Sequence, residues 1–308
     1  APILMLNCIP IFADADPETF NVDPKSVEER ISDRTKAIIV AHIAGQPCDM
    51  DPLVQIARDH NLVLIEDASQ SHDAEYKGRK AGTMGDIAVF SLMGGKHITA
   101  GGQGGMVITN NEELYWNAKR FADRGKPFGC DETTNIFLGL NYRMTELDAA
   151  IGRVQLTKLP QIVAKRREAV SWIGERISDL KTVRLGKVIE GAVSSYWFLF
   201  LHVDESQLTV SKNDFARAVA AEGVPASPAY DNLICDQSWI RNRQAYGKSG
   251  CPWSCPFYGK EVVYEGSCPN ARKAIDSHMA MAVHECYTEQ EADDIAQALR
   301  KVEQHCLK

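Results

Sequence analysis

The sequence predicts an α/β protein with an open sheet in its first half and a smaller α+β part at its C-terminus. The first half alternates short apolar runs with amphipathic segments, which is typical of β-α-β units joined by right-handed crossovers. After residue 180, an aromatic-rich run and a long stretch without periodicity replace this alternation. We therefore place a domain boundary near residues 160–180 and expect a large domain at 1–165 and a small domain at 166–308.

The elements of the first half follow from apolar runs and from the residues at their ends. Asp23-Pro24 opens a helix, because proline is favoured at the first helical position and acidic residues favour the first turn. The fully apolar run 37–42 is expected to be a central strand of the sheet. The expected strands are 9–14, 37–42, 62–66, 87–91 and 105–109. The expected helices are 25–31, 51–62 and 112–124.

The second half is predicted to be rich in helices. Thr145 and Asp148 resemble a capping box, so we expect a helix to begin there. Pro160 should interrupt it, because an internal proline removes a backbone hydrogen bond, and a second helix should continue to about residue 180. Residues 231–269 are expected to be irregular. The remaining expected elements are a strand at 196–203 and helices at 211–222, 270–278 and 288–302.

Composition excludes several classes of partner. The chain has 34 Lys and Arg residues against 41 Asp and Glu residues, interspersed along it, and a formal net charge of −7. This charge gives no electrostatic case for binding nucleic acid or an anionic membrane. No apolar run is long enough to span a bilayer. The apolar start lacks the basic residues of a signal peptide, so we expect a cytoplasmic protein.

Nine cysteines is a high and odd number for a chain of this length. Their positions favour free thiols in a reducing cytoplasm, with a disulfide among some of them as an alternative. A zinc site at Cys251 and Cys255 is a further alternative, but no second Cys or His pair with ligand spacing accompanies these residues. We therefore expect no metal site.

An acid, a hydroxyl and an amine follow neighbouring strands of the predicted sheet. Asp67 follows the strand 62–66, Ser91 ends the strand 87–91, and Lys96 lies five residues further in a glycine-flanked loop. Because ligands of open α/β sheets bind beyond the carboxyl ends of the strands, these side chains are expected to share one crevice. They are the groups that pyridoxal phosphate (PLP) needs: an amine for its aldehyde, a carboxylate for its pyridine nitrogen and a donor for its phosphate.

Spacing alone leaves simpler interpretations open. A lysine in a glycine-rich loop is usually only solvated, and an aspartate after a strand often caps a helix. The glycines at 101, 102, 104 and 105 could also belong to a phosphate loop, although neither GxxxxGK[ST] nor GxGxxG occurs there.

Motifs spread over nearly the whole chain carry a family resemblance. They are IPIFADADPETFNVDP at 9–24, RTKAIIVAHIAG at 34–45, IEDASQSHDAEYKG at 65–78, GDIAVFSLMGGK at 85–96, GGQGGMVITN at 101–110 and GLNYRMTELDAAIGRVQLTKL at 139–159. The segments that begin at Cys268 and Tyr287 also fit. In these motifs the chain resembles the DegT/DnrJ/EryC1/StrS family of PLP-dependent sugar aminotransferases. The resemblance implies fold type I, with a three-layer large domain and a smaller α+β domain.

The resemblance also implies roles for residues in the matching motifs. Lys96 would carry PLP covalently and, once released, would move a proton on the substrate. Asp67 would pair with the pyridine nitrogen, Gln70 would lie over the cofactor, and Ser91 would bind the phosphate. Asn141 would reach the phosphate in the other subunit, because members of this family are homodimers with shared sites.

Three further residues are placed near the substrate by the same resemblance. Arg143 could approach the neighbouring subunit's site or form a structural ion pair, and both interpretations stay open. His72 lies within a matching motif but could equally be a hydrogen-bonded structural histidine. Tyr230 aligns with a segment on the substrate side.

The chain departs from the family's usual pattern at three places. Met93-Gly94-Gly95 stands where an aromatic or polar pair usually precedes the lysine, and Gln103 stands where glutamate is common. The family's glycine-threonine phosphate loop and the aromatic residue that stacks on the cofactor would lie before residue 1. We expect either a truncated chain or a natural fragment with weakened PLP binding.

The preferred hypothesis is a PLP-dependent aminotransferase. It would move an amino group from glutamate or glutamine to a nucleotide-linked keto-sugar or to a cyclitol. A PLP-dependent sugar dehydratase is an alternative, but such dehydratases carry histidine where this chain has Lys96. A non-catalytic partner or regulatory protein of the same fold is a third hypothesis. The missing N-terminal segment favours it, and the set of Lys96, Asp67 and Ser91 opposes it. Acceptor specificity is expected to depend on residues 231–269, because loops carry such variation.

Overall fold

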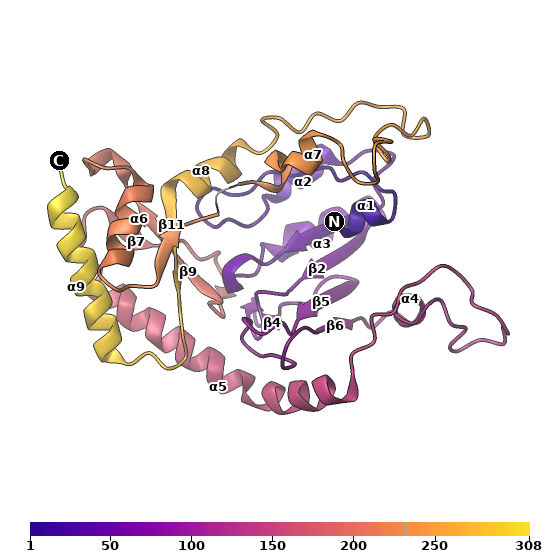
Figure 1. Ribbon diagram of the computed structural model, residues 1–308, viewed down its shortest axis with the longest axis horizontal. Helices are drawn as coiled ribbons and strands as arrows, with labels where there is room; N and C mark the ends of the chain where they lie inside the picture. The colour runs from indigo at the N-terminus through magenta and orange to yellow at the C-terminus, as the bar shows by residue number, and fades with distance from the viewer. Residues whose placement is uncertain (231) are drawn as a thin grey trace.

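The computed structural model describes residues 1–230 and 232–308, and a four-stranded sheet lies at its centre (Figure 1). The strands are β1 (Ala37–Ala41), β2 (Val63–Asp67), β5 (Ile87–Ser91) and β6 (Gly105–Ile108). They lie in the order β1-β2-β5-β6, with the first three parallel and β6 antiparallel to β5. Each bound lies within one residue of its prediction from sequence.

Two strand predictions are wrong. β1 lies at an edge of the described sheet rather than in its centre, and its Ile39 side chain is 45% exposed. Residues 9–14 form no strand in the described structure, because their polar groups bind elsewhere. The N–H of Asp14 donates to Ser26 Oγ (2.8 Å), and its carbonyl accepts the N–H of Asp23 (3.0 Å). An apolar run alone therefore did not separate a strand from a packed extended segment.

Helices α2 (Pro24–Arg30) and α3 (Met50–Asp59) pack against the sheet. Asp23 caps α2 as predicted, since its carboxylate accepts the N–H of Lys25 (3.0 Å). The shared core contains Val27, Ile38, Val40, Leu53, Ile56 and Leu64. The smaller elements of this half are α1 (Pro2–Met5), β3 (Glu75–Tyr76), β4 (Arg79–Lys80) and α4 (Glu112–Phe121).

The prediction that Pro160 interrupts a helix is also wrong. α5 (Glu146–Arg176) is one helix of 31 residues that contains Pro160 and runs along one side of the molecule (Figure 1). Pro160 is exposed, so the carbonyl that loses its hydrogen bond there can meet water. Thr145 caps the helix as predicted, because its hydroxyl accepts the N–H of Asp148 (3.2 Å). Since α5 crosses residue 165, the division into two domains stays a prediction.

A second sheet, entirely antiparallel, organises the C-terminal part. Its strands are β7 (Val183–Leu185), β9 (Phe198–Val203), β10 (Ala226–Pro228) and β11 (His278–Ala282), in the order β10-β11-β9-β7. The sequence predicted β9 but missed the other three and the short β8 (Ala192–Val193), which pairs with β3. Helices α6 (Lys212–Ala221) and α9 (Glu289–Cys306) share its core with the end of α5. None of the helices in the described residues is long and apolar enough to cross a membrane.

The segment predicted to be irregular packs against the first residues of the chain. Its first residue, 231, lies outside the described residues, and the α-helix that lies wholly within the described part of the segment is α7 (Ser238–Arg241). The Tyr264 hydroxyl donates to the carbonyl of Pro10 (2.9 Å). The carboxylate of Asp14 accepts the N–H groups of Asn270 (3.0 Å) and Ala271 (2.9 Å) in the first turn of α8 (Pro269–Ser277). An aspartate near one end of the chain thus caps a helix near the other.

Candidate active site

Lys96 lies in the loop between β5 and β6, which is anchored on α5. The N–H of Leu92 donates to the carbonyl of Gly104 (2.8 Å) and closes the two arms of this loop. The N–H of Lys96 donates to the carbonyl of Met93 (3.0 Å) and forms a tight turn. The apolar residues that hold the loop on α5 are Leu92, Ile98, Ala100, Leu159 and Val163. The lysine is therefore presented by a packed turn.

Asp67 and Ser91 are the last residues of β2 and β5. These strands are parallel neighbours, so both residues lie at the carboxyl ends of their strands and at the same edge of the sheet. The Asp67 carboxylate accepts the N–H of Ser69 (3.0 Å), and the Ser91 hydroxyl accepts the N–H of Met93 (3.3 Å). Burial lowers the pKa of the Lys96 amine, and the charge of Asp67 opposes that shift. The acid and the amine therefore act on each other, although their catalytic roles stay a prediction.

Trp197, from the second half of the chain, contacts the same loop, and sequence reasoning missed it. Nζ of Lys96 lies 3.8 Å from the centre of the indole ring. The indole N–H donates to the carbonyl of Gly95 at 2.7 Å. The sequence offers only an aromatic-rich run at 196–203, which by itself indicates a strand.

The segment that carries Trp197 is held by Arg166 of α5. The Arg166 side chain is buried, forms an ion pair with Glu285 (2.9 Å), and donates to the carbonyls of Tyr196 and Trp197 (3.2 Å each). The N–H of Trp197 donates to the carbonyl of Ala44 (2.9 Å). The position of the indole is thus set from both halves of the chain.

Two buried histidines, His72 and His97, lie near Lys96 with their ring centres 5.4 Å apart. In the described structure the ring nitrogens of His72 make no hydrogen bond of ordinary geometry, although the backbone of Ser91 acts on its pKa, whereas Nε2 of His97 lies 2.9 Å from the carbonyl of Ser195. Burial lowers the pKa of His72 to about 4 and that of His97 to about 3, and the charge of Lys96 acts in the same direction. Both imidazoles are therefore neutral at pH 7, and a role for His72 toward substrate stays a prediction.

The fold brings Gln70 and Tyr230 together. Oε1 of Gln70 accepts the N–H of Ala44 (2.7 Å), the residue whose carbonyl binds Trp197. Tyr230 is 44% exposed, yet desolvation of its phenol raises the pKa of that group, and a hydrogen bond with Gln70 opposes the shift. The Tyr230 ring meets Phe198 edge-on, with ring centres 6.1 Å apart. Gln70 thus contacts Ala44, which binds Trp197, and Tyr230 contacts Phe198, the residue after Trp197, while the functions of both predicted residues remain predictions.

Asn141 and Arg143 lie on an exposed loop and contact each other. The side-chain oxygen of Asn141 accepts Nε–H of Arg143 (3.3 Å). The Arg143 guanidinium lies 3.5 Å from the carboxylate of Asp123, which is the structural ion pair left open for it. A contact of either residue with a second subunit stays a prediction.

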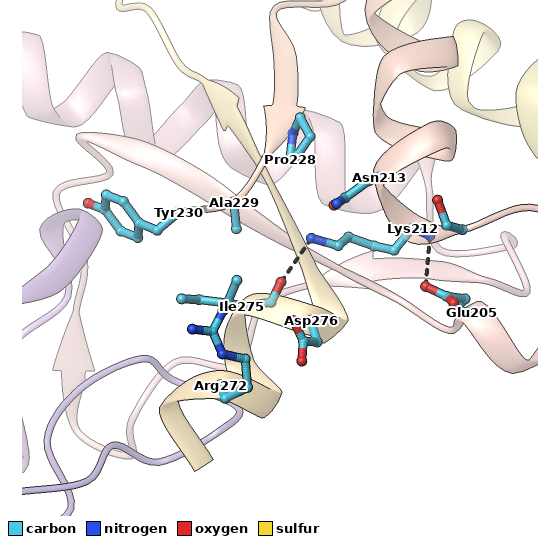
Figure 2. Close-up of a pocket in the computed structure, with 10 residues that line it drawn as sticks. Glu205, Lys212, Asn213, Pro228, Ala229, Tyr230, Arg272, Ile275 and Asp276 are labelled. Atoms are coloured by element: carbon cyan, nitrogen blue, oxygen red, sulfur yellow. Dashed lines mark hydrogen bonds between the residues drawn. The ribbon is translucent and has the colours of Figure 1, made fainter. Parts of the chain in front are cut away.

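The second half of the chain contains an open cavity of about 380 Å³ (Figure 2). Of the predicted site residues, Tyr230 lines it. Nζ of the buried Lys212 donates to the carbonyl of Ile275 (2.9 Å), near the end of α8, and its backbone N–H donates to the carboxylate of Glu205 (2.8 Å) (Figure 2). A cation near a helix C-terminus stabilises the helix, so the contact with Ile275 is structural.

The described residues contain no group of three or more His, Cys, Asp or Glu side chains that could hold a metal ion. The nine cysteines all lie within these residues and are free thiols, Cys251 and Cys255 among them. Among the candidate sites in the described residues, we therefore take the polar groups around Lys96 as the candidate active site.

Residues 1–262 match the DegT/DnrJ/EryC1/StrS aminotransferase family. A GDP-perosamine synthase from Caulobacter vibrioides is 37% identical over 225 residues, which cover 72% of this chain and 59% of that protein. An L-glutamine:2-deoxy-scyllo-inosose aminotransferase from Streptomyces kanamyceticus is 30% identical over 317 aligned residues, which cover 98% of this chain and 73% of that protein.

Among solved structures, an aminotransferase from Psychrobacter cryohalolentis superposes with a TM-score of 0.82 at 28% identity, over 98% of this chain and 77% of that one. The chain spans about three-fifths to three-quarters of the length of these relatives. The prediction of fold type I is confirmed by this likeness, and the predicted family by the match over most of the chain. The chain belongs to the DegT/DnrJ/EryC1/StrS aminotransferase family.

Proposed function

We propose that this protein is a PLP-dependent aminotransferase. It transfers an amino group from glutamate or glutamine to a nucleotide-linked keto-sugar or to a keto-cyclitol. The family supports the reaction class. A GDP-perosamine synthase and a glutamine-dependent inosose aminotransferase among the relatives support the two classes of acceptor. The observation that carries the proposal is the partly desolvated amine of Lys96, with the carboxylate of Asp67 acting on it at the edge of the sheet.

The residues at this edge fit PLP. When bound, PLP supplies an aldehyde for an amine and a ring that accepts electrons. Because burial lowers the pKa of Lys96, more of this amine is neutral and able to form a bond or accept a proton. Asp67 would hold the proton of the pyridine nitrogen, Gln70 would cover the ring, and Ser91 would donate to the phosphate. The buried ring of His72, which makes no hydrogen bond of ordinary geometry among the described residues, would have a nitrogen to offer to a polar group of a ligand.

In each half of the reaction Lys96 would move a proton. It would take the proton from the α-carbon of the amino-acid donor, and it would return a proton to the acceptor carbon that receives the amine. An amine that alternates between neutral and charged forms suits this work, and burial and Asp67 act on the pKa of Lys96 in opposite directions.

We further propose a homodimer with shared sites. The first half of α5 and the loop before it expose more apolar surface than a monomer usually leaves open. The exposed large apolar residues there are Ile136, Phe137, Leu138, Leu140, Tyr142, Leu147, Ile151, Val154 and Leu156. Asn141 and Arg143 lie within this surface, so a second copy that covers it would bring them near a partner. Sedimentation should give a dimer, and Leu147→Glu, at a side chain 78% exposed, should give a monomer.

A cytoplasmic location is part of the proposal. The nine cysteines, all free thiols, support it, because disulfides are rare in a reducing compartment.

The enzyme proposal is tested by adding PLP to the purified chain and recording the visible absorbance of bound cofactor. We expect a band that is lost in Lys96→Ala and kept in Lys36→Ala, which removes an exposed lysine. Glutamate or glutamine should then bleach the band, and a nucleotide-linked keto-sugar or a keto-cyclitol should restore it. An equal band in Lys96→Ala, or no band with the unaltered chain even at a high concentration of PLP, would contradict the proposal.

A further inference from the structure

The indole of Trp197 contacts the loop that carries Lys96 at two points. Nζ lies 3.8 Å from the centre of the ring, and the indole N–H donates to the carbonyl of Gly95, the residue before the lysine, at 2.7 Å. One part of the side chain therefore contacts the amine, and another holds the backbone that carries it. An ammonium near an aromatic face is stabilised electrostatically, and tryptophan gives the strongest such contact.

The backbone that carries the indole is held by contacts that do not involve the lysine. The backbone of Trp197 is bound on both sides, by Arg166 at its carbonyl (3.2 Å) and by Ala44 at its N–H (2.9 Å). The preceding residue, Tyr196, has a φ of 48°, a left-handed conformation that costs energy in a residue other than glycine. The surrounding contacts maintain this conformation, and the ring next to Lys96 is held by it.

We propose that Trp197 is a positioning residue for Lys96: its ring stabilises the ammonium form of the amine, and its N–H fixes the loop that presents it. This inference rests on the proposed function, in which Lys96 must be neutral to bond to the cofactor and charged to return a proton. A residue from the second half of the chain thereby sets the balance between the two forms of the amine.

Burial and the aromatic ring act on Lys96 in opposite directions. Burial disfavours the ammonium and lowers the pKa, whereas the ring favours the ammonium and raises it. If Trp197 only shielded the amine from solvent, removing its ring would admit water and raise the pKa of Lys96. If the ring stabilises the charge, replacing it with an apolar chain of similar reach lowers that pKa. The sign of the change therefore separates the two roles.

The pKa of Lys96 can be measured in the chain without cofactor, by competitive labelling with acetic anhydride and peptide mass spectrometry. This reagent acylates only neutral amines. In Trp197→Met we expect the pKa of Lys96 to fall by about one unit, with about tenfold faster labelling at a fixed pH below the pKa. Trp197→Phe keeps a weaker aromatic face and should give an intermediate pKa. Trp116→Met is the matched control: its ring lies 5.2 Å from Lys119 on α4, and its loss should leave Lys96 unchanged.

An unchanged or higher pKa of Lys96 in folded Trp197→Met would overturn the inference. Urea unfolding shows whether each variant is folded, and if the methionine variant is not, the phenylalanine variant decides by the same criterion. Failure of the proposed function gives a different result, namely no visible band when PLP is added to the unaltered chain, whatever the labelling of Lys96 shows.

Discussion

His42 and Glu66 form a fully buried pair, with Nε2 of the imidazole 2.9 Å from a carboxylate oxygen. The same carboxylate accepts the backbone N–H groups of Gly82 and Met84, each at 2.7 Å. Glu66 comes directly before Asp67, so this network fixes the end of β2 and with it the carboxylate proposed to serve the cofactor.

Glu66→Gln should destabilise the protein strongly. The amide keeps the shape of the side chain but loses its charge and directs an N–H group at another donor. We expect the free energy of unfolding, measured with urea, to fall by about 3 kcal/mol. Glu29→Gln, at an exposed position of α2, is the control and should change it by less than about 0.5 kcal/mol. Equal effects at the two positions would show that the buried pair does not support β2.

Three buried histidines should make stability depend on pH. Burial lowers the pKa of His72 and of His278 to about 4, and that of His97 to about 3, from an ordinary value of 6.5. Below pH 6.5 the unfolded chain therefore binds protons that the folded protein does not. The stabilisation is complete above this pH and is lost as the pH falls through about 4.

Within that window the free energy of unfolding should fall by about 1.4 kcal/mol per pH unit for each of these histidines. Urea unfolding at a series of pH values measures the slope. His72→Gln should reduce this slope by the contribution of one histidine, because glutamine does not titrate. The same slope in both proteins would rule out a neutral, buried His72.

Gly45 lies where a side chain would collide with the segment that carries Trp197. Its φ is +98°, and a Cβ there would lie 2.5 Å from the nitrogen of Tyr196 and 2.9 Å from that of Trp197. Gly78 has a φ of +77° with open space around it, and so is a matched control for backbone strain. Gly78→Ala should cost about 1 kcal/mol of unfolding free energy, and Gly45→Ala clearly more. Urea unfolding followed by tryptophan fluorescence measures both, and equal costs would contradict the close approach at Gly45.

Pro160→Ala should stabilise the protein. Alanine restores an N–H that can donate to the carbonyl four residues earlier, at Leu156, in the middle of α5. The expected gain in unfolding free energy is at most about 3 kcal/mol. Gln161→Ala, at the next exposed position, should change it by less than about 0.5 kcal/mol. A loss of stability in Pro160→Ala would mean that the packing of α5 requires the proline.

Elements with strong local signals could be predicted from sequence. The caps at Asp23 and Thr145 each accept a backbone N–H in the structure, because capping needs only a suitable side chain at the start of a helix. The position of a strand within its sheet depends on distant segments, so the apolar run at 37–42 could not show that it lies at an edge. The effect of Pro160 depended likewise on which face of α5 is exposed.

In the candidate site too, some residues could be predicted from sequence and one could not. Asp67 and Ser91 end adjacent parallel strands and Lys96 lies in the loop that follows, so their placement at one edge of the sheet could be expected from their order along the chain. Trp197 lies 102 residues from Gly95, whose carbonyl it binds, and reaches it through the packing of the second half of the chain. No spacing in the sequence encodes such a contact.

The capping of α8 by Asp14 has a consequence for synthesis of the protein. The N–H groups that Asp14 accepts belong to residues 256 and 257 positions later in the chain. At about 5–20 residues per second, a ribosome would make these partners roughly 10–50 s after Asp14. The apolar residues at the start of the chain that share a core with the later segment, Leu4, Ile9 and Phe12, are without those partners for the same time. Contacts of such long separation slow folding, so the nascent chain should need protection from aggregation until its last quarter has been made.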